Sequence, residues 1–203
     1  CRRSRTMTQQ IELFYDFRSP YSYLAFTQLR QMDVVITLRP MKILKVMEKV
    51  GNVPTTITCA AKGRYARVDV RRWAQRYGVP LNPSDMRAND GDACSRAVLS
   101  AEGPEDAAAI TLALYRAIWS EGKTLANAAD VVAAIADAGI DTEPIAARID
   151  RSEMAAQLDA NTDEAAERGV FGSPTVFVGE AMFFGNDRLE FVREELARLE
   201  EAA

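Results

Sequence analysis

The residues IELFYDF occupy positions 11–17 and are followed at once by Arg18, Ser19 and Pro20. The segment is rich in aromatic and β-favouring residues and nearly continuous in apolarity, as in a strand whose sheet is covered on both faces. A serine followed by a proline is typical of a helix start, with the serine as N-cap and the proline in the first turn. The sequence therefore predicts a central strand that runs directly into a helix.

The predicted helix extends from about Tyr21 to Met32, and a second β-rich run, VVITL, follows at residues 34–38. A strand, a helix and a strand within about thirty residues form a βαβ unit, whose two strands are parallel. The beginning of the chain thus predicts one half of an α/β sheet.

Two short β-rich runs lie near the end of the chain, TVFV at residues 175–178 and AMFF at residues 181–184. The Gly-Glu pair between them is typical of a tight hairpin turn. Asp187 and Glu190 have the spacing of a capping box, so a last helix is expected to start at Asp187.

The middle of the chain, residues 41–168, has apolar residues at helical spacing. Trp73 and Tyr77 share one helix face with other apolar residues and are therefore assigned to the core. The helices expected here end at Gly78, start at Pro104, run from Asn127 to Gly139, and cover Thr162–Gly169.

This order of elements predicts an α/β protein with a thioredoxin-like fold and a large helical insertion domain. The expected parts are a disordered N-terminal tail at residues 1–10, a thioredoxin-like domain formed by residues 11–40 and 162–203, and a helical insertion domain at residues 41–161. Residues 1–6 contain arginines but no apolar core, so they are not a signal peptide, and Met7 is the expected start of the native chain.

The composition is that of an ordinary globular protein. Of 203 residues, 48% are hydrophobic and 27% are charged, and the net charge is −4. No basic stripe suits a nucleic acid, and no apolar run approaches the roughly 20 residues that cross a bilayer. We therefore expect neither a nucleic-acid partner nor a membrane.

The residue types also limit the chemistry. The chain has no histidine, which excludes Ser-His-Asp triads, Cys-His dyads and histidine-ligated metals. The cysteines, Cys1, Cys59 and Cys94, are far apart, and no CxxC occurs. This pattern argues against a disulfide scaffold, a zinc site and dithiol exchange, and it suits a reducing cytoplasm.

Ser19 is the first candidate site residue, because it lies at the junction of a parallel strand and a helix, where α/β folds place their sites. A helix N-terminus offers unpaired backbone N–H groups and a positive dipole, which favour an anion such as a thiolate. A serine hydroxyl there can donate a hydrogen bond to that anion. The alternative is that Ser19 only caps the helix.

Two further signals lie in the C-terminal part. In Phe171–Thr175 (FGSPT), a proline directly precedes a strand, where it removes a donor and is expected to be cis. The backbone of Ser173 would then face a bound peptide, and the alternative is an edge-strand or turn proline. In Gly185–Arg188, Asp187 either receives the amino group of a ligand or caps the last helix.

Taken together, these segments resemble the 2-hydroxychromene-2-carboxylate isomerases, which are related to the kappa-class glutathione transferases and the DsbA-like thioredoxin proteins. The similarity covers about Ile11 to Leu199. The segments that carry it are ELFYDFRSPYSYLA at 12–25, GNVP at 51–54, KGRY at 62–65, FGSP at 171–174 and FGNDRL at 184–189. The chain has Ser-Pro-Tyr-Ser where the DsbA branch has CxxC, which fits the glutathione-using branch.

The resemblance implies glutathione as the cofactor, with Ser19 as the catalytic residue whose hydroxyl favours the glutathione thiolate. It further implies that Asn52 contacts glutathione and that Ser173, before cis-Pro174, exchanges backbone hydrogen bonds with its cysteine. Ser19 is not expected to act as a covalent nucleophile, because no base is present to deprotonate it.

Two more contacts follow from the same resemblance. Asn186 and Asp187 match the residues that hold the γ-glutamyl end of glutathione. Lys62 and Tyr65 are candidates for the glycine carboxylate or the substrate, and their alternatives are a solvated lysine and a core tyrosine.

The implied reaction is the glutathione-dependent cis–trans isomerisation of 2-hydroxychromene-2-carboxylate to trans-o-hydroxybenzylidenepyruvate, in the breakdown of naphthalene-type aromatics. The partners would be glutathione and a small aromatic carboxylate. Lys42, Lys45, Lys62 or Arg64 would seat that carboxylate, and the sequence does not choose among them. A homodimer is expected because relatives are usually dimers.

Three alternatives stay open at this point. The first is a kappa-like glutathione transferase or peroxidase that acts on other electrophiles. The second is a thioredoxin-like binding module without turnover. The third, a DsbA-like oxidase, is disfavoured because both motif cysteines are absent.

Overall fold

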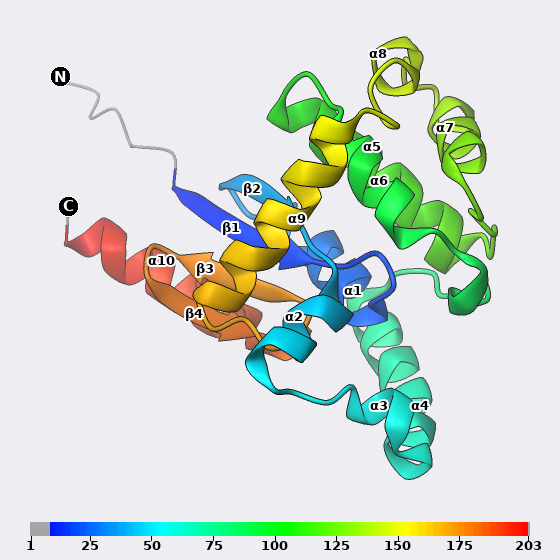
Figure 1. Ribbon diagram of the computed structural model, residues 1–203. Coiled ribbons are helices and arrows are strands. Elements are labelled where there is room, and N and C mark those ends of the chain that lie inside the picture. Colours follow the sequence, from blue (N-terminus) through cyan, green and yellow to red (C-terminus); the bar gives the residue numbers. More distant parts are fainter. Residues whose placement is uncertain (1–8, 203) are drawn as a thin grey trace, which may run out of the picture.

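The computed structural model describes residues 9–202, and its sheet has four strands in the order β2-β1-β3-β4 (Figure 1). β1 (Gln10–Tyr15) is parallel to β2 (Val35–Pro40), as the βαβ pattern predicts. β3 (Thr175–Val178) is antiparallel to β1 and forms the predicted hairpin with β4 (Ala181–Phe184). β1 is therefore an inner strand, which explains its nearly continuous apolar sequence.

Some helices cover the two faces of this sheet, and others form a separate group beside it (Figure 1). In the described part of the chain they are α1 (Pro20–Leu29), α2 (Ile43–Val50), α3 (Thr55–Thr58), α4 (Ala60–Tyr77), α5 (Gly91–Leu99), α6 (Pro104–Tyr115), α7 (Ala128–Asp137), α8 (Glu143–Ala146), α9 (Ser152–Glu167) and α10 (Leu189–Glu201). Short helical turns add η1 (Met86–Ala88), η2 (Arg116–Ser120) and η3 (Asn186–Arg188). No helix within residues 9–202 is both long and apolar enough to cross a membrane.

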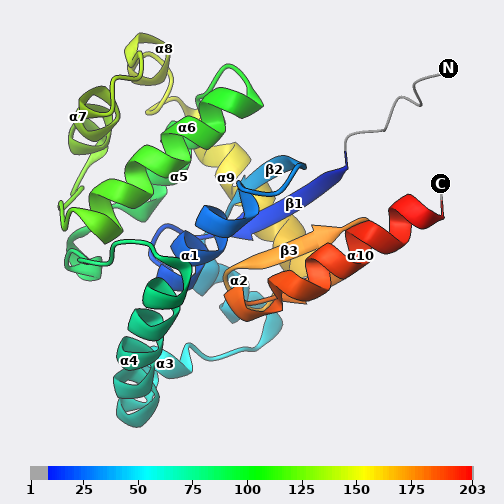
Figure 2. The same ribbon diagram turned by 180° about the vertical axis from the view of Figure 1, so that it is seen from behind.

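Alternating side chains of β1 enter two different cores. Leu13 and Tyr15 belong to the larger core, with residues of α1, α5, α6 and α10. Phe14 belongs to the smaller core, together with Val46 of α2 and Ala165 of α9. Figure 1 shows α2 and α9 over one face of the sheet, and Figure 2 shows α1 and α10 over the other. The α/β class and the thioredoxin-like fold are thus confirmed.

The predicted strand–helix junction is correct in its main features. Ser19 is the N-cap of α1 and Pro20 occupies its first turn. The strand ends at Tyr15 and not at Phe17, because the chain turns at Asp16, whose carboxylate accepts the N–H of Arg18 at 2.9 Å. The caps predicted at Gly78 and Asn127 are also present.

The predicted short helix Thr162–Gly169 is wrong, because these residues are the second half of the longer α9. Figure 1 shows α9 running from the helical group across the sheet, so the expected boundary between residues 161 and 162 falls inside one helix. The division into a thioredoxin-like domain and an insertion domain otherwise stays a prediction.

The expected N-terminal tail overlaps the sheet. Gln10 begins β1, and the side-chain amide of Gln9 donates to the Leu196 carbonyl in α10 at 2.6 Å. The remaining residues of the expected tail, and Met7, lie outside the described residues.

Cys94 and Cys59 are predicted to differ sharply in reactivity. Cys94 is fully buried in α5, and burial raises the pKa of its thiol, whereas Cys59 is half-buried before α4. In a Cys1→Ser background, an alkylating reagent should therefore label one thiol in the native protein and both after unfolding. Labelling of Cys94 at neutral pH without unfolding would contradict the buried position.

Candidate functional site

The loop between β1 and α1 is fixed by a buried carboxylate. Asp16 is 1% exposed, and its oxygens accept hydrogen bonds from the Arg18 N–H, Nε and Nη2 at 2.9, 2.9 and 2.8 Å. The same carboxylate accepts the Ile43 N–H at 3.0 Å, which ties the loop to α2. The hydrogen bonds to Asp16 raise the pKa of the Arg18 guanidinium.

Ser19 lies at the centre of the site. Its Oγ accepts the Ser22 N–H at 3.2 Å, which is the N-cap bond, and donates to the Ser173 carbonyl at 3.0 Å. The peptide bond between Ser173 and Pro174 is cis, as predicted. The two predicted segments, 154 residues apart in sequence, therefore meet through a direct hydrogen bond.

Backbone donors flank the Ser19 hydroxyl. Within residues 9–202, neither the Tyr21 N–H nor the Ser173 N–H donates to an acceptor. Tyr21 is in the first turn of α1, where N–H groups have no intrahelical partner and the helix dipole is positive. The donors at this junction thus suit a sulfur anion together with a peptide main chain.

Asn52 borders the same loop from the other side. Its Nδ2 donates to the Phe171 carbonyl at 2.8 Å, and its Oδ1 accepts the Val53 N–H at 2.8 Å. Asn52 therefore joins the segment after α2 to the loop that leads into Pro174.

The predicted cap by Asp187 is wrong. Arg188 precedes α10 and makes no side-chain cap, and Asp187 lies in the turn η3. Gly185 has a φ of +99°, and a Cβ on it would lie 2.6 Å from the Asp187 Oδ1. A glycine is thus required for the Asp187 carboxylate to lie back over this turn, where it is exposed and pairs with Arg188 at 2.6 Å.

Tyr21 connects the start of α1 to α4. Its hydroxyl donates to Asp69 Oδ2 at 2.9 Å. Burial raises the pKa of Tyr21, and the hydrogen bond to Asp69 raises it further. Tyr21, two residues after Ser19, thus ties the candidate site to the helix that carries Lys62 and Tyr65.

The two candidates on α4 are exposed. Lys62 and Tyr65 share one helix face with Asp69, and Tyr65 is 63% exposed. The core alternative for Tyr65 is therefore wrong. Within the described residues, the Lys62 side chain makes no hydrogen bond and no ion pair.

Of the other basic candidates, Lys42 and Lys45 have acidic partners. Lys42 lies 2.7 Å from Asp159 and 3.7 Å from Asp92, and Lys45 lies 3.0 Å from Glu48. These pairs reduce the positive charge that either lysine could offer to a carboxylate.

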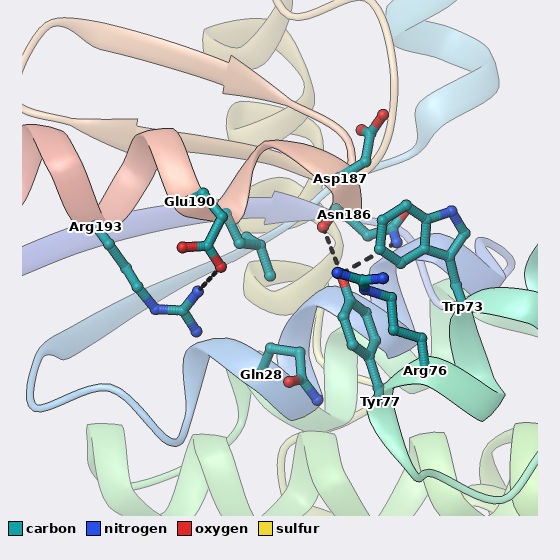
Figure 3. Close-up of a pocket in the computed structure, with 9 residues that line it drawn as sticks. Gln28, Trp73, Arg76, Tyr77, Asn186, Asp187, Glu190 and Arg193 are labelled. Atoms are coloured by element: carbon teal, nitrogen blue, oxygen red, sulfur yellow. Dashed lines mark hydrogen bonds and ion pairs between the residues drawn. The ribbon is translucent and has the colours of Figure 1, made fainter.

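A cavity of about 310 Å³ lies between α1, α4 and the start of α10 (Figure 3). Trp73 and Tyr77 are partly buried and pack against the larger core, which confirms their core assignment. The two side chains also line the cavity. The Tyr77 hydroxyl donates to the carbonyl of the buried Asn186 at 2.8 Å. Figure 3 shows the Asp187 side chain pointing away from Tyr77.

The sequence reasoning missed three features of this site. Asp16 was not distinguished from the rest of its strand, although an acidic residue two positions before Arg18, in a nearly continuous apolar segment, was a signal. The hydroxyls of Ser22 and Ser173 gave no signal, because their partners are distant in sequence. The ion pair of Glu190 and Arg193, at 2.6 Å beside the cavity, was likewise not expected.

Comparison with known proteins agrees with this geometry. Residues 10–197 match the family model described as the DSBA-like thioredoxin domain. The 2-hydroxychromene-2-carboxylate isomerase of Sphingobium xenophagum is 32% identical, with 94% of this chain and 99% of that protein covered. That of Pseudomonas putida is 33% identical, with 93% and 95% covered. Glutathione S-transferase kappa 1 of Rattus norvegicus is 28% identical, with 90% and 88% covered.

Solved structures give the same result. A structure of 2-hydroxychromene-2-carboxylate isomerase superposes with a TM-score of 0.83 at 29% identity, covering 94% of this chain and 95% of the other. The chain belongs to the DSBA-like thioredoxin family and, within it, to the family of the 2-hydroxychromene-2-carboxylate isomerases.

Proposed function

We propose that this protein is a glutathione-dependent isomerase that converts 2-hydroxychromene-2-carboxylate to trans-o-hydroxybenzylidenepyruvate. The observation that carries the proposal is the direct hydrogen bond between Ser19, at the α1 N-terminus, and the Ser173 carbonyl before cis-Pro174. Relatives with 32% and 33% identity over nearly the whole chain are named for this reaction.

The residues present fit glutathione by their donor set. The Tyr21 N–H and the Ser19 hydroxyl would hold the sulfur, and the Ser173 N–H and carbonyl would hold the cysteine main chain. Because the hydroxyl has one hydrogen, its bond to the Ser173 carbonyl would be replaced by the bond to the sulfur when glutathione binds. Asn186 and Asp187 would hold the γ-glutamyl end. The bound tripeptide would supply a thiolate for reversible conjugate addition, which makes the double bond of the substrate a single bond that can rotate before the thiolate leaves and the double bond is restored.

The protein's own contribution would be electrostatic. The positive end of α1 and the donated hydroxyl favour the charged form of a thiol, whose ordinary pKa is about 8.5. Apart from the ionisation of the thiol, the proposed chemistry requires no residue that abstracts a proton at neutral pH. This agrees with the absence of histidine from the sequence.

The test is a spectrophotometric assay of 2-hydroxychromene-2-carboxylate with and without glutathione. We expect rapid conversion that requires glutathione. A panel with an aryl halide and an organic peroxide tests the second candidate, a kappa-like transferase or peroxidase, which the kappa 1 relatives at 28% identity support. Turnover of the panel without turnover of the chromene would replace the isomerase proposal by the transferase.

Lys62 is proposed to bind the glycine carboxylate of glutathione. Because it is exposed on α4, we expect Lys62→Ala to raise KM for glutathione about fivefold, equivalent to about 1 kcal/mol, and to weaken the salt dependence of KM. Lys45→Ala is the matched control, since Lys45 is also exposed but is paired with Glu48. Equal KM values for the two variants would remove Lys62 from the site.

The homodimer and the cytoplasmic location stay predictions. Sedimentation of the purified protein would test the first, with a mass twice that of one chain as the expected result.

A further inference from the structure

A pair of serine hydroxyls lies behind the proposed glutathione seat. The Ser173 Oγ accepts the Asp16 N–H at 3.0 Å and lies 2.6 Å from the Ser22 Oγ. One side chain on the loop before Pro174 thus contacts both the β1–α1 loop and the first turn of α1. These contacts involve the side chain of Ser173, whereas Ser19 contacts its main chain.

The Ser22 side of this pair has no access to solvent. Ser22 is 0% exposed and lies one helical turn after Ser19. The neighbouring residue Tyr23 is 2% exposed, and its ring packs against that of Tyr115, which is 0% exposed, in the same core. A water molecule therefore cannot readily replace the Ser173 hydroxyl at Ser22.

The hydrogen bonds restrict the side-chain rotamer of Ser173 and, with it, the position of the residue whose carbonyl accepts the Ser19 hydroxyl. We propose that Ser22 and Ser173 are positioning residues, whose paired hydroxyls hold the Ser173 main chain where the cysteine main chain of glutathione binds. The inference rests on the proposed function. Neither hydroxyl is assigned a contact with sulfur, so the pair affects binding of the peptide and not ionisation of the thiol.

Two probes separate these effects: glutathione, and the tripeptide γ-glutamyl-2-aminobutyryl-glycine, which has a methyl group in place of the thiol. Calorimetry would measure the Kd of each for the full-length wild type and the variants. We expect Ser173→Ala to weaken both ligands by the same factor, about tenfold, or about 1.4 kcal/mol. Ser22→Ala removes one of the two hydrogen bonds of Ser173 and should weaken both ligands equally but less.

Three further variants make the comparison specific. Ser173→Thr keeps the hydroxyl and should restore the Kd of the wild type. Ser95→Ala removes another buried serine hydroxyl, one that donates to the Gly91 carbonyl at 2.9 Å within α5, and should leave both Kd values unchanged. Ser19→Ala should weaken glutathione much more than the methyl analogue, since it acts on the thiolate. If Ser173→Ala does not fold, Ser22→Ala carries the test.

Wild-type affinity for both ligands in Ser22→Ala and Ser173→Ala would overturn the inference and leave the proposed function intact. A loss confined to glutathione would also overturn it, because the hydroxyls would then act on the thiolate. Failure of the wild type to bind glutathione would overturn the proposed function and the inference together.

Discussion

Ser19→Ala is expected to lower kcat/KM for the glutathione-dependent isomerisation about a hundredfold, a loss of about 2.7 kcal/mol of transition-state stabilisation. The Ser19 hydroxyl is the side-chain donor at the start of α1, and it already donates a hydrogen bond at 3.0 Å to the neighbouring Ser173 carbonyl. The measurement is the initial rate of substrate conversion at saturating and at limiting glutathione.

Ser19 also caps α1, so a control must separate capping from catalysis. Asn127 caps α7 in the same way, by accepting the Asp130 N–H at 3.0 Å. Asn127→Ala should lose about 1 kcal/mol of stability, as Ser19→Ala does, but keep its activity. Ser19→Thr keeps the hydroxyl and should retain most of the rate. An active Ser19→Ala enzyme would leave Ser19 with its structural role alone.

Asp16→Asn is expected to lower the free energy of unfolding by about 3 kcal/mol. The carboxylate is buried and accepts four hydrogen bonds, three from Arg18 and one from the Ile43 N–H. An amide carries one acceptor oxygen, so its NH₂ would face a guanidinium donor and leave buried donors without partners. Urea unfolding monitored by circular dichroism measures the change.

Asp85→Asn serves as the control for this prediction. Asp85 also accepts a backbone N–H, that of Arg87 at 3.0 Å. Unlike Asp16, it is exposed and does not pair with Arg18. Its substitution should cost less than about 1 kcal/mol. Equal unfolding midpoints for the two variants would show that burial and the ion pair with Arg18 add no stability at Asp16.

Local sequence signals predicted the strand–helix junction at Ser19 and the cis-proline before β3 correctly. The capping serine, the proline in the first helical turn and the proline before β3 each act through backbone conformation within a few residues. Their physical effects therefore appear in the sequence directly. The parallel pairing of β1 and β2 follows from the same local pattern together with the βαβ rule.

The full length of α9 was not predicted: its first half buries the apolar Met154 and Leu158, but the buried face continues through two polar residues in the middle of the helix. Asn161 donates to the Pro40 carbonyl at 3.1 Å, and Thr162 accepts the Lys42 N–H at 3.1 Å. Both side chains are buried and satisfied by partners about 120 residues away in sequence. A periodicity argument counts such residues as exposed and so shortens the helix.

The wrong cap at Asp187 and the unpredicted contacts of the Ser173 hydroxyl have a similar cause. Asp187 has the spacing of a cap, but the positive φ of Gly185 places its carboxylate over the turn before α10. Ser173 was considered for its main chain alone, whereas its hydroxyl contacts Asp16 and Ser22. In each case the decisive contact depends on tertiary geometry.

In the proposed function, Ser19 and the α1 N-terminus stabilise the thiolate of bound glutathione. The direct measurement is the pKa of that thiol in the complex, from the ultraviolet absorbance of the thiolate as a function of pH. We predict a value below about 7.5 in the wild type, at least one unit below an ordinary thiol, and a clear rise in Ser19→Ala. A bound thiol that titrates like free glutathione in both proteins would contradict the account.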